Sequence, residues 1–333
     1  MKRVAIVGFD HLHAIAYLDV FSGHPAVELV GICDEGVNRA LASERALSEG
    51  LAFSADLSAY SEWAVDGIYV GTTPVRHREI VELAAARGVH VMCDKPLATT
   101  LQDADAILQA VGEARVGLCV PFRPVFQEPI RLAMERLRSG AVGEVQAIYA
   151  VKYGRGPTSA SVGMNAEWFL DSDQAGFGGF GDIGSHALDT MCRIVDSRPA
   201  QVYARLGSPA PGAIDDLGTA HLEFANGVHG VLSAGWVNPS ASPRWLEVRF
   251  EVLTSTHTFV VSAPYREFEV VTNEHRRLVP WHRDDLAGHV DDFVTAMSGD
   301  SPTVSGLDGR ANLVVLLAAY RSAAIGEPVA VPE

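Results

Sequence analysis

Two features of this chain, a pair of residues and a single lysine, have the residue types and positions that proton transfer requires. The first is Asp182 and His186, which lie four residues apart in the segment AEWFLDSDQAGFGGFGDIGSHALDTM (166–191). On a helix this spacing puts both side chains on one face, where a carboxylate can tune a histidine as a general acid or base. A helix cap beside a structural histidine would give the same pattern.

The second feature is a lysine, Lys95. It follows the apolar run VHVMCD (89–94), so we expect it at the carboxyl end of a buried strand. Ligands of open α/β sheets bind in the crevice outside those strand ends. A catalytic lysine and a plain surface lysine are both compatible with this spacing.

Near the N-terminus, the stretch VAIVGFDHLH (4–13) contains an incomplete nucleotide-binding motif. A strand that ends in glycine and leads into a helix is typical of the dinucleotide-binding turn G-x-G-x-x-G. Here only Gly8 is present, and Asp10 and His13 occupy the second and third glycine positions. Asp10 would repel a pyrophosphate unless its side chain caps the helix, whereas a nearby histidine could offset it by donating hydrogen bonds.

Asp34 supports a nucleotide site, because it ends the next strand-like run, VELVGICD (27–34). An acidic residue at the end of the second strand is placed to bind a ribose 2′-hydroxyl. Glu35 follows it, and no arginine stands beside the two in the sequence. We therefore expect NAD rather than NADP, with an ordinary turn carboxylate as the alternative.

His11 and His13 also raise the question of a metal site, with Asp10 as a third ligand. Residues i and i+2 do not face each other on a helix, so chelation would need an irregular turn. No metal is expected on these grounds. The four cysteines contain no C-x-x-C pair and are expected to be reduced core residues: Cys33, Cys93, Cys119 and Cys192.

The elements that must position these residues fall into two regions. Up to about residue 120, apolar runs without polar alternation are separated by helical stretches. This pattern predicts a parallel sheet covered on both faces, a doubly wound Rossmann-type α/β domain over 1–120. Beyond it, strand-like runs with few helices predict an α+β domain over 121–333 with a large, mostly antiparallel sheet. The Asn226-Gly227 pair predicts a tight hairpin there, and closing helices are expected near 285–298 and 306–325.

The composition narrows the class of protein. Of 333 residues, 48% are hydrophobic and 20% are charged, which is an ordinary globular balance, and the net charge is −15. Because no basic patch offsets this charge, nucleic acid and anionic membranes are not expected as partners. No run approaches the ~20 apolar residues of a membrane span, and no signal peptide is apparent, so a cytoplasmic location is expected.

The run GTTPVRHREIVELAAARGVHVMCDKPLATT (71–100) resembles the Gfo/Idh/MocA oxidoreductases, relatives of glucose–fructose oxidoreductase and inositol dehydrogenase. In that family a strand ends in Thr-Pro, a histidine lies near the start of the next helix, and a further strand ends in Glu-Lys-Pro. The matching residues, with aspartate for the usual glutamate, are Thr73-Pro74, His77 and Asp94-Lys95-Pro96.

The second half of the chain carries the resemblance further. The family's second domain has a glycine-rich approach to Asp-x-Gly-x-His-x-x-Asp, and Asp182, Gly184, His186 and Asp189 match it in turn. Agreement extends over essentially the whole chain. The stretch GFDHLH is the clear departure, and it puts the cofactor affinity in question rather than the fold.

The resemblance implies an NAD-dependent oxidoreductase acting on a secondary hydroxyl of a sugar, cyclitol or sugar derivative held between the two domains. His186 or Lys95 would remove the hydroxyl proton while hydride passes to the nicotinamide. A homodimer or homotetramer is expected. A redox-neutral enzyme that retains NAD, for elimination, hydrolysis or epimerisation, is one alternative, and a non-catalytic nucleotide or sugar sensor is another.

The expected site residues form three overlapping sets. The catalytic residues are Lys95, Asp182 and His186. The substrate-binding residues are these three together with Arg123 and Trp168. The cofactor-binding residues are Gly8, Phe9, Asp10, His11, Leu12, His13, Asp34, Thr72, Thr73, Pro74, His77, Asp94 and Lys95.

Overall fold

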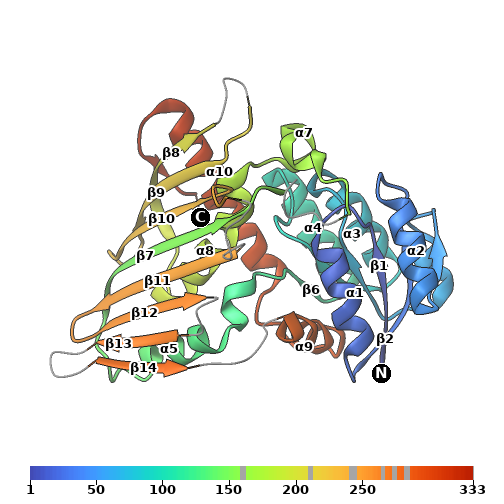
Figure 1. The fold of residues 1–333 in the computed structure, drawn as a ribbon, viewed down its shortest axis with the longest axis horizontal. Coiled ribbons are helices and arrows are strands. Elements are labelled where there is room, and N and C mark those ends of the chain that lie inside the picture. The colour runs from blue at the N-terminus through green and yellow to red at the C-terminus, as the bar shows by residue number, and fades with distance from the viewer. Residues whose placement is uncertain are drawn as a thin grey trace. The chain divides into compact units, whose positions relative to one another are not determined.

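The computed structural model describes residues 1–157, 163–208, 213–239, 246–263, 267–271, 276–280 and 286–332. Figure 1 shows the chain coloured from its N-terminus to its C-terminus, and the chain divides into two compact units. The first unit consists of Met1–Pro121, Ser161–Gly176 and Leu286–Leu313, and the second of Phe122–Ala160, Phe177–Asp285 and Val314–Glu333. Asp285, where the first closing helix is predicted to begin, lies outside the described residues.

The first unit is built on a six-stranded sheet in the order β3-β2-β1-β4-β5-β6 among the described residues, and every pairing is parallel. This is the doubly wound order, in which the strand order reverses between β1 and β4, and ligands bind at that point. The predicted α/β sheet is therefore confirmed. Its strands are β1 (Lys2–Val7), β2 (Val27–Cys33), β3 (Ala52–Ser54), β4 (Gly67–Val70), β5 (His90–Cys93) and β6 (Leu118–Cys119).

Helices connect these strands and cover the sheet. The central strands are buried on both faces, as the uninterrupted apolar runs predict: Val4–Val7 of β1 are fully buried. At α4 the Thr100 side chain accepts a hydrogen bond from the Asp103 amide and so caps the first turn. The connecting helices are α1 (His13–Gly23), α2 (Arg39–Glu49), α3 (His77–Ala86) and α4 (Leu101–Ala114), with short 3₁₀ turns at Ala59–Trp63 and Pro74–Arg76.

Two later segments of the chain also belong to the first unit, although the sequence assigned them to the second domain. One contains a 3₁₀ turn (Glu167–Leu170) and α7 (Ser172–Ala175), and the other contains α9 (Leu286–Met297). Helix α9 belongs to the first unit because of its apolar packing. Phe293 and Met297 lie in the core of that unit, where they contact Gly67, which has no side chain. Helix α10 (Gly306–Ile325) begins in the first unit and ends in the second.

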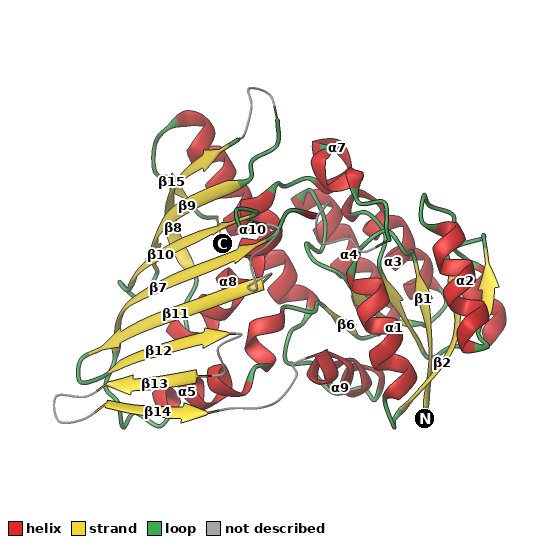
Figure 2. Cartoon of the chain, in the orientation of Figure 1, coloured by secondary structure: helices red, strands yellow, loops and turns green. Residues whose placement is uncertain are grey.

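The second unit contains a nine-stranded sheet among the described residues, in the order β14-β13-β12-β11-β7-β10-β9-β8-β15 (Figure 2). Only the β7–β10 pairing is parallel in this described sheet, so the predicted mostly antiparallel sheet is confirmed. The strands are β7 (Val145–Gly154), β8 (Pro199–Gly207), β9 (Leu217–Phe224), β10 (His229–Gly235), β11 (Leu246–Thr254), β12 (Thr258–Ala263), β13 (Glu267–Val271), β14 (Arg276–Pro280) and β15 (Val329–Ala330).

The turn between β9 and β10 contains Asn226 and Gly227, as the sequence predicts, and Gly227 has a φ of +85° that favours glycine. The helices of this unit are α5 (Glu128–Arg138) and α8 (Gly179–Val195), and a 3₁₀ turn spans Arg123–Phe126. Helix α8 packs on β7, β9 and β10. None of the helices in the described part of the chain is long and apolar enough to cross a membrane.

Candidate functional site

The first glycine of the incomplete motif is required by its contact with β4. Gly8 has a φ of +88°, and a Cβ there would lie 2.6 Å from the Thr72 amide nitrogen and overlap the Thr72 side chain. The amides of Asp10 and His11, further along the turn, donate hydrogen bonds of 3.0 and 2.9 Å to the Gly71 carbonyl. The turn is thus fastened to the end of β4, whatever residues occupy the second and third glycine positions.

Asp34 lies beside this turn, as its place at the end of β2 predicts. Its Oδ1 accepts a 2.8 Å hydrogen bond from the Phe9 amide. Its Oδ2 is buried and has no hydrogen-bond partner among the described residues, and burial raises the pKa of this carboxyl above its ordinary value. Buried acceptors are nearly always paired in native proteins, so this oxygen fits a ligand hydroxyl such as that of a ribose.

Asp10 does not cap α1, although the sequence allowed it. The N-cap residue, Leu12, makes no side-chain cap, and the Asp10 carboxylate accepts a hydrogen bond from the Thr73 amide and points toward Gly36. Burial, with the nearby charge of Asp34, raises the pKa of Asp10 to about 6. At neutral pH, about one unit above this value, the carboxylate still carries most of its negative charge, so other groups of the turn must offset it toward a pyrophosphate.

An arginine does lie near the acidic pair at the end of β2, although none is adjacent in sequence. Arg76, from the turn before α3, binds Glu35 at 2.7 Å and Glu79 at 2.8 Å. The fold brings Arg76 here from the 3₁₀ turn that follows the carboxyl end of β4, the edge at which β2 also ends. Because two carboxylates already share its charge, Arg76 is poorly disposed to bind a 2′-phosphate.

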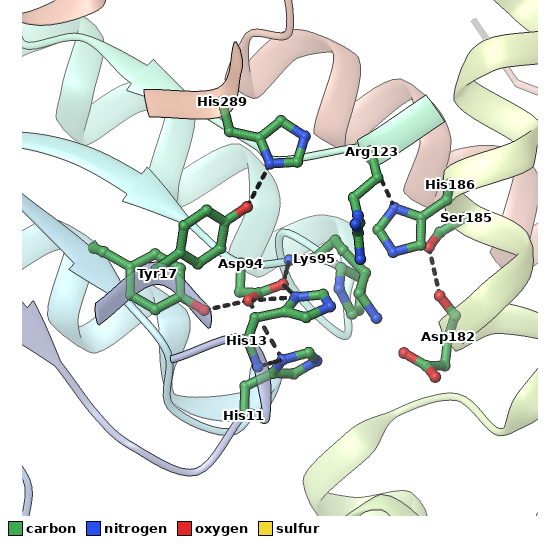
Figure 3. A network of polar contacts seen from close by, with 12 residues as sticks. His11, His13, Tyr17, Asp94, Lys95, Arg123, Asp182, Ser185, His186 and His289 are labelled. Atoms are coloured by element: carbon green, nitrogen blue, oxygen red, sulfur yellow. Dashed lines mark hydrogen bonds and ion pairs between the residues drawn. The ribbon is translucent and has the colours of Figure 1, made fainter. Parts of the chain in front are cut away.

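The Asp94 carboxylate is the centre of a buried cluster in the first unit (Figure 3). Its two oxygens lie 3.0 and 3.2 Å from His13 Nδ1, and Oδ2 lies 3.4 Å from His11 Nδ1. The Tyr69 hydroxyl donates to Oδ2, and the Lys95 amide donates to Oδ1 at 2.7 Å. Burial raises the pKa of Asp94, but the two histidines and Lys95 more than offset it and hold the pKa well below its usual range.

Lys95 itself is buried, with 3% of its surface exposed, at the carboxyl end of β5. The loop that follows is tied down by His77, whose ring nitrogens lie 3.1 Å from the Pro96 carbonyl oxygen and 3.3 Å from the Thr72 carbonyl oxygen. His77 is fully buried, and that burial lowers its pKa. The structure thus places His77 as the link between the end of β4 and the Lys95 loop.

Trp168 lies on the nucleotide-binding turn rather than among groups of the second unit. Its Nε1 donates a 3.1 Å hydrogen bond to the Asp10 carbonyl, and its ring stacks on Phe169 at 3.8 Å. Asn165, in the same segment, exchanges two hydrogen bonds with Asn38, of 2.8 and 3.0 Å. The segment therefore covers the turn and holds its geometry.

In the second unit, α8 places Asp182 and His186 as the sequence predicts, four residues apart on a buried helix (Figure 3). His186 Nδ1 accepts a hydrogen bond from the Arg123 amide at 3.3 Å, so the Arg123 backbone orients the ring. The Asp182 carboxylate accepts a 2.9 Å bond from the indole of Trp236. Each side chain is thus oriented by a partner from another element.

The glycines that precede α8 allow its first turn to approach the loop before β9. The Gly179 amide donates to the Asp215 carbonyl at 2.7 Å, and a Cβ on Gly179 would lie 2.5 Å from the Asp216 carbonyl oxygen. The Asp215 carboxylate accepts from the Phe180 amide at 2.9 Å and from the Tyr320 hydroxyl at 2.7 Å. This bracing fixes the start of the helix that carries His186.

Sequence reasoning missed several residues that shape these groups. Tyr69 and Trp236 lie in or after strands and carry no motif of their own, so only their three-dimensional contacts identify them. Asp215 and Tyr320 lie far apart in the chain, and no spacing rule joins them.

Comparisons with known proteins match two models of one family. The model described as the oxidoreductase family with an NAD-binding Rossmann fold matches residues 2–122. The model described as the GFO/IDH/MocA C-terminal domain matches residues 130–260. Together the two matches make up well over half of the chain.

Curated relatives extend over most of the chain. A D-apiose dehydrogenase from Paraburkholderia graminis is 27% identical, over 96% of this chain and 86% of its own length. A myo-inositol 2-dehydrogenase from Thermotoga maritima is 26% identical over 78% and 77%. A levoglucosan dehydrogenase solved with NADH and levoglucosan has a TM-score of 0.86 at 23% identity, with 100% of both chains covered, which establishes the shared fold.

The contact of Asp34 predicts its effect on cofactor choice. Asp34→Asn keeps an oxygen that can accept from the Phe9 amide but removes the negative charge that opposes a 2′-phosphate. We expect the ratio of NAD to NADP affinity to fall at least tenfold, which is about 1.4 kcal/mol. Calorimetric titration with each nucleotide measures it, and an unchanged ratio would show that Asp34 does not face the ribose.

The bracing of α8 predicts a stability effect. Gly179→Ala would press a Cβ against the Asp216 carbonyl and lower the free energy of unfolding by about 1–3 kcal/mol. Gly207→Ala is the matched control, because a Cβ there meets its nearest neighbour at 3.7 Å. Urea unfolding of both variants gives the comparison, and equal stabilities would contradict the tight approach.

Proposed function

The chain belongs to the Gfo/Idh/MocA family of oxidoreductases, and from this premise we propose that it is an NAD-dependent dehydrogenase acting on a secondary hydroxyl of a sugar or cyclitol. The observation that carries the proposal is the buried Lys95 at the carboxyl end of β5, in an NAD-binding Rossmann domain. Two relatives that match most of the chain are named for D-apiose and myo-inositol, which supports a polyhydroxylated substrate.

The residues present fit NAD. Asp34 Oδ2 is the buried acceptor for a ribose hydroxyl. Gly8 brings the backbone of the turn close to β4, and Leu12 and His13 lie at the start of α1, where helix amides favour a pyrophosphate. When bound, NAD supplies the hydride acceptor for oxidation of an alcohol.

The protein's own part is to position the substrate and to move one proton. The sequence left His186 and Lys95 as alternative bases. His186 Nδ1 accepts from the Arg123 amide, so this nitrogen carries a lone pair and the neutral ring carries its proton on Nε2. We therefore assign His186 as a hydrogen-bond donor to the substrate oxygen. Lys95 is then the group that takes up the hydroxyl proton, and Asp182, held by Trp236, helps bind the substrate.

This assignment predicts different losses at the two positions. Lys95→Met removes the base and should lower kcat by about 10²–10⁴-fold, with the affinity for NAD unchanged. Lys2→Met is the control, because Lys2 bonds only a backbone carbonyl, that of Met297, among the contacts described for it. NADH formation from a panel of D-apiose, myo-inositol and levoglucosan provides the assay.

His186 offers a finer test. His186→Gln can keep an N–H donor and should lose about tenfold in kcat/KM, whereas His186→Ala should lose at least about 10²-fold. If His186 were the base, both variants would lose activity equally. Tight NAD binding with substrate conversion but no NADH would instead favour a redox-neutral reaction, and a chain that converts none of these compounds would favour a sensor.

A further inference from the structure

His11, His13 and Asp94 form a buried cluster. The function proposed above does not explain why this cluster contains two histidines. We propose that it binds one divalent transition-metal ion, of the class that includes Zn²⁺ and Co²⁺, with Asp94 as the third ligand. The sequence considered Asp10 for that position, but Asp10 points toward Gly36 and bonds the Thr73 amide. Asp94, which directly follows β5 and lies 81 residues from His13 in the chain, takes its place.

The spacing of the donor atoms fits a tetrahedral ion. Asp94 Oδ2 lies 3.0 Å from His13 Nδ1 and 3.4 Å from His11 Nδ1, and the three donor atoms lie within 4.8 Å of one another. Zinc bonds to nitrogen and oxygen of about 2.0–2.2 Å require neighbouring tetrahedral ligands about 3.3 Å apart. Small shifts of the rings would therefore bring all three atoms into bonding distance.

The irregular start of α1 makes this arrangement possible. His11 lies in the turn before the helix, which begins at His13, so the i, i+2 pair escapes the helical geometry that would separate it. The two rings have centroids 4.2 Å apart and reach the same carboxylate (Figure 3). The irregular turn that chelation by this pair of histidines requires is therefore present.

The hydrogen bonds of the cluster favour a cation at its centre. The His13 amide donates to His11 Nδ1 at 3.2 Å, so this nitrogen presents a lone pair. It also lies 3.4 Å from the Asp94 oxygen, and a positive charge between these two atoms, whether a proton or a metal ion, stabilises both. A metal ion supplies that charge. His11 Nδ1 then forms a coordinate bond to the ion in place of its hydrogen bond from the His13 amide.

The surroundings match those of metal ligands. His11, His13 and Asp94 are 2, 9 and 0% exposed, so few waters compete for the ion. The Tyr69 hydroxyl and the Lys95 amide bond to Asp94 and fix its orientation, as outer partners of metal ligands do. Three protein ligands leave a fourth position for water or a ligand oxygen, and imidazole with carboxylate suits Zn²⁺ or Co²⁺ better than Mg²⁺.

The test uses Co²⁺ as the probe on the full chain after treatment with a chelator. Visible absorption should show one Co²⁺ per chain with the intense bands of tetrahedral coordination, and Zn²⁺ should displace it. Because the ligands must be deprotonated, binding should also release protons, which calorimetry in buffers of different ionisation enthalpy measures. This readout is independent of dehydrogenase activity.

Variants locate the ion. His11→Ala and Asp94→Asn should each weaken Co²⁺ binding at least about 10-fold, the lower bound for loss of even an outer partner of a metal ligand. His24→Ala is the matched control, because His24 also pairs with a carboxylate, Asp291, at 3.1 Å, but lies outside the cluster. Circular dichroism confirms that each variant is folded.

Two results would overturn the proposal. Wild-type protein with no saturable Co²⁺ absorption would show that the cluster is held by protons alone, whatever the variants do. Binding that is equally strong in the folded His11→Ala and Asp94→Asn variants would show that the ion lies elsewhere. Loss in those variants with retention in His24→Ala would establish the site.

Discussion

The buried carboxylate of Asp94 is the interaction on which the nucleotide-binding unit depends. It directly follows β5, at the edge where the parallel strands present their carboxyl ends, and it is inaccessible to solvent. A buried charge is costly unless it is paired and hydrogen-bonded. Two histidines, a tyrosine hydroxyl and the Lys95 amide meet that need, and together they join β1's turn, β4 and the Lys95 loop.

This pairing also explains how the turn tolerates its missing glycines. A side chain at the third glycine position would normally be expected to push the helix from the strand. Here His13 turns its ring toward Asp94 and becomes part of the packing. Gly8 alone is kept, because its backbone contacts Thr72 too closely for any Cβ. Polar contacts between side chains thus hold this turn, which lacks the backbone freedom of the two missing glycines.

Much of the architecture was predictable from the sequence, because it rests on local periodicity. Buried apolar runs such as Val4–Val7 predict the parallel strands, and Asn226-Gly227 predicts the hairpin that is observed. The closing helices were also predictable as helices, but not their partners. Whether α9 packs on one unit or the other is decided by Phe293 and Met297 meeting Gly67, which is a contact between distant parts of the chain.

In the candidate site, too, local patterns predicted the positions of residues but not their long-range contacts. Asp34, Lys95 and His186 follow from strand ends and helical spacing. The contacts that define their roles do not, because they join residues far apart in sequence: Arg123 on His186, Trp236 on Asp182, and Asp94 on His13. No local rule pairs a histidine in the first turn with an aspartate that follows the fourth strand after it.

The central claim is that the turn GFDHLH, with a single glycine, is a working NAD site. Calorimetric titration of the cofactor-stripped chain with NAD, and separately with NADP, tests it most directly. The account predicts micromolar binding of NAD and much weaker binding of NADP. Binding of neither nucleotide would mean that Asp10 and His13 close the site, and it would contradict the account.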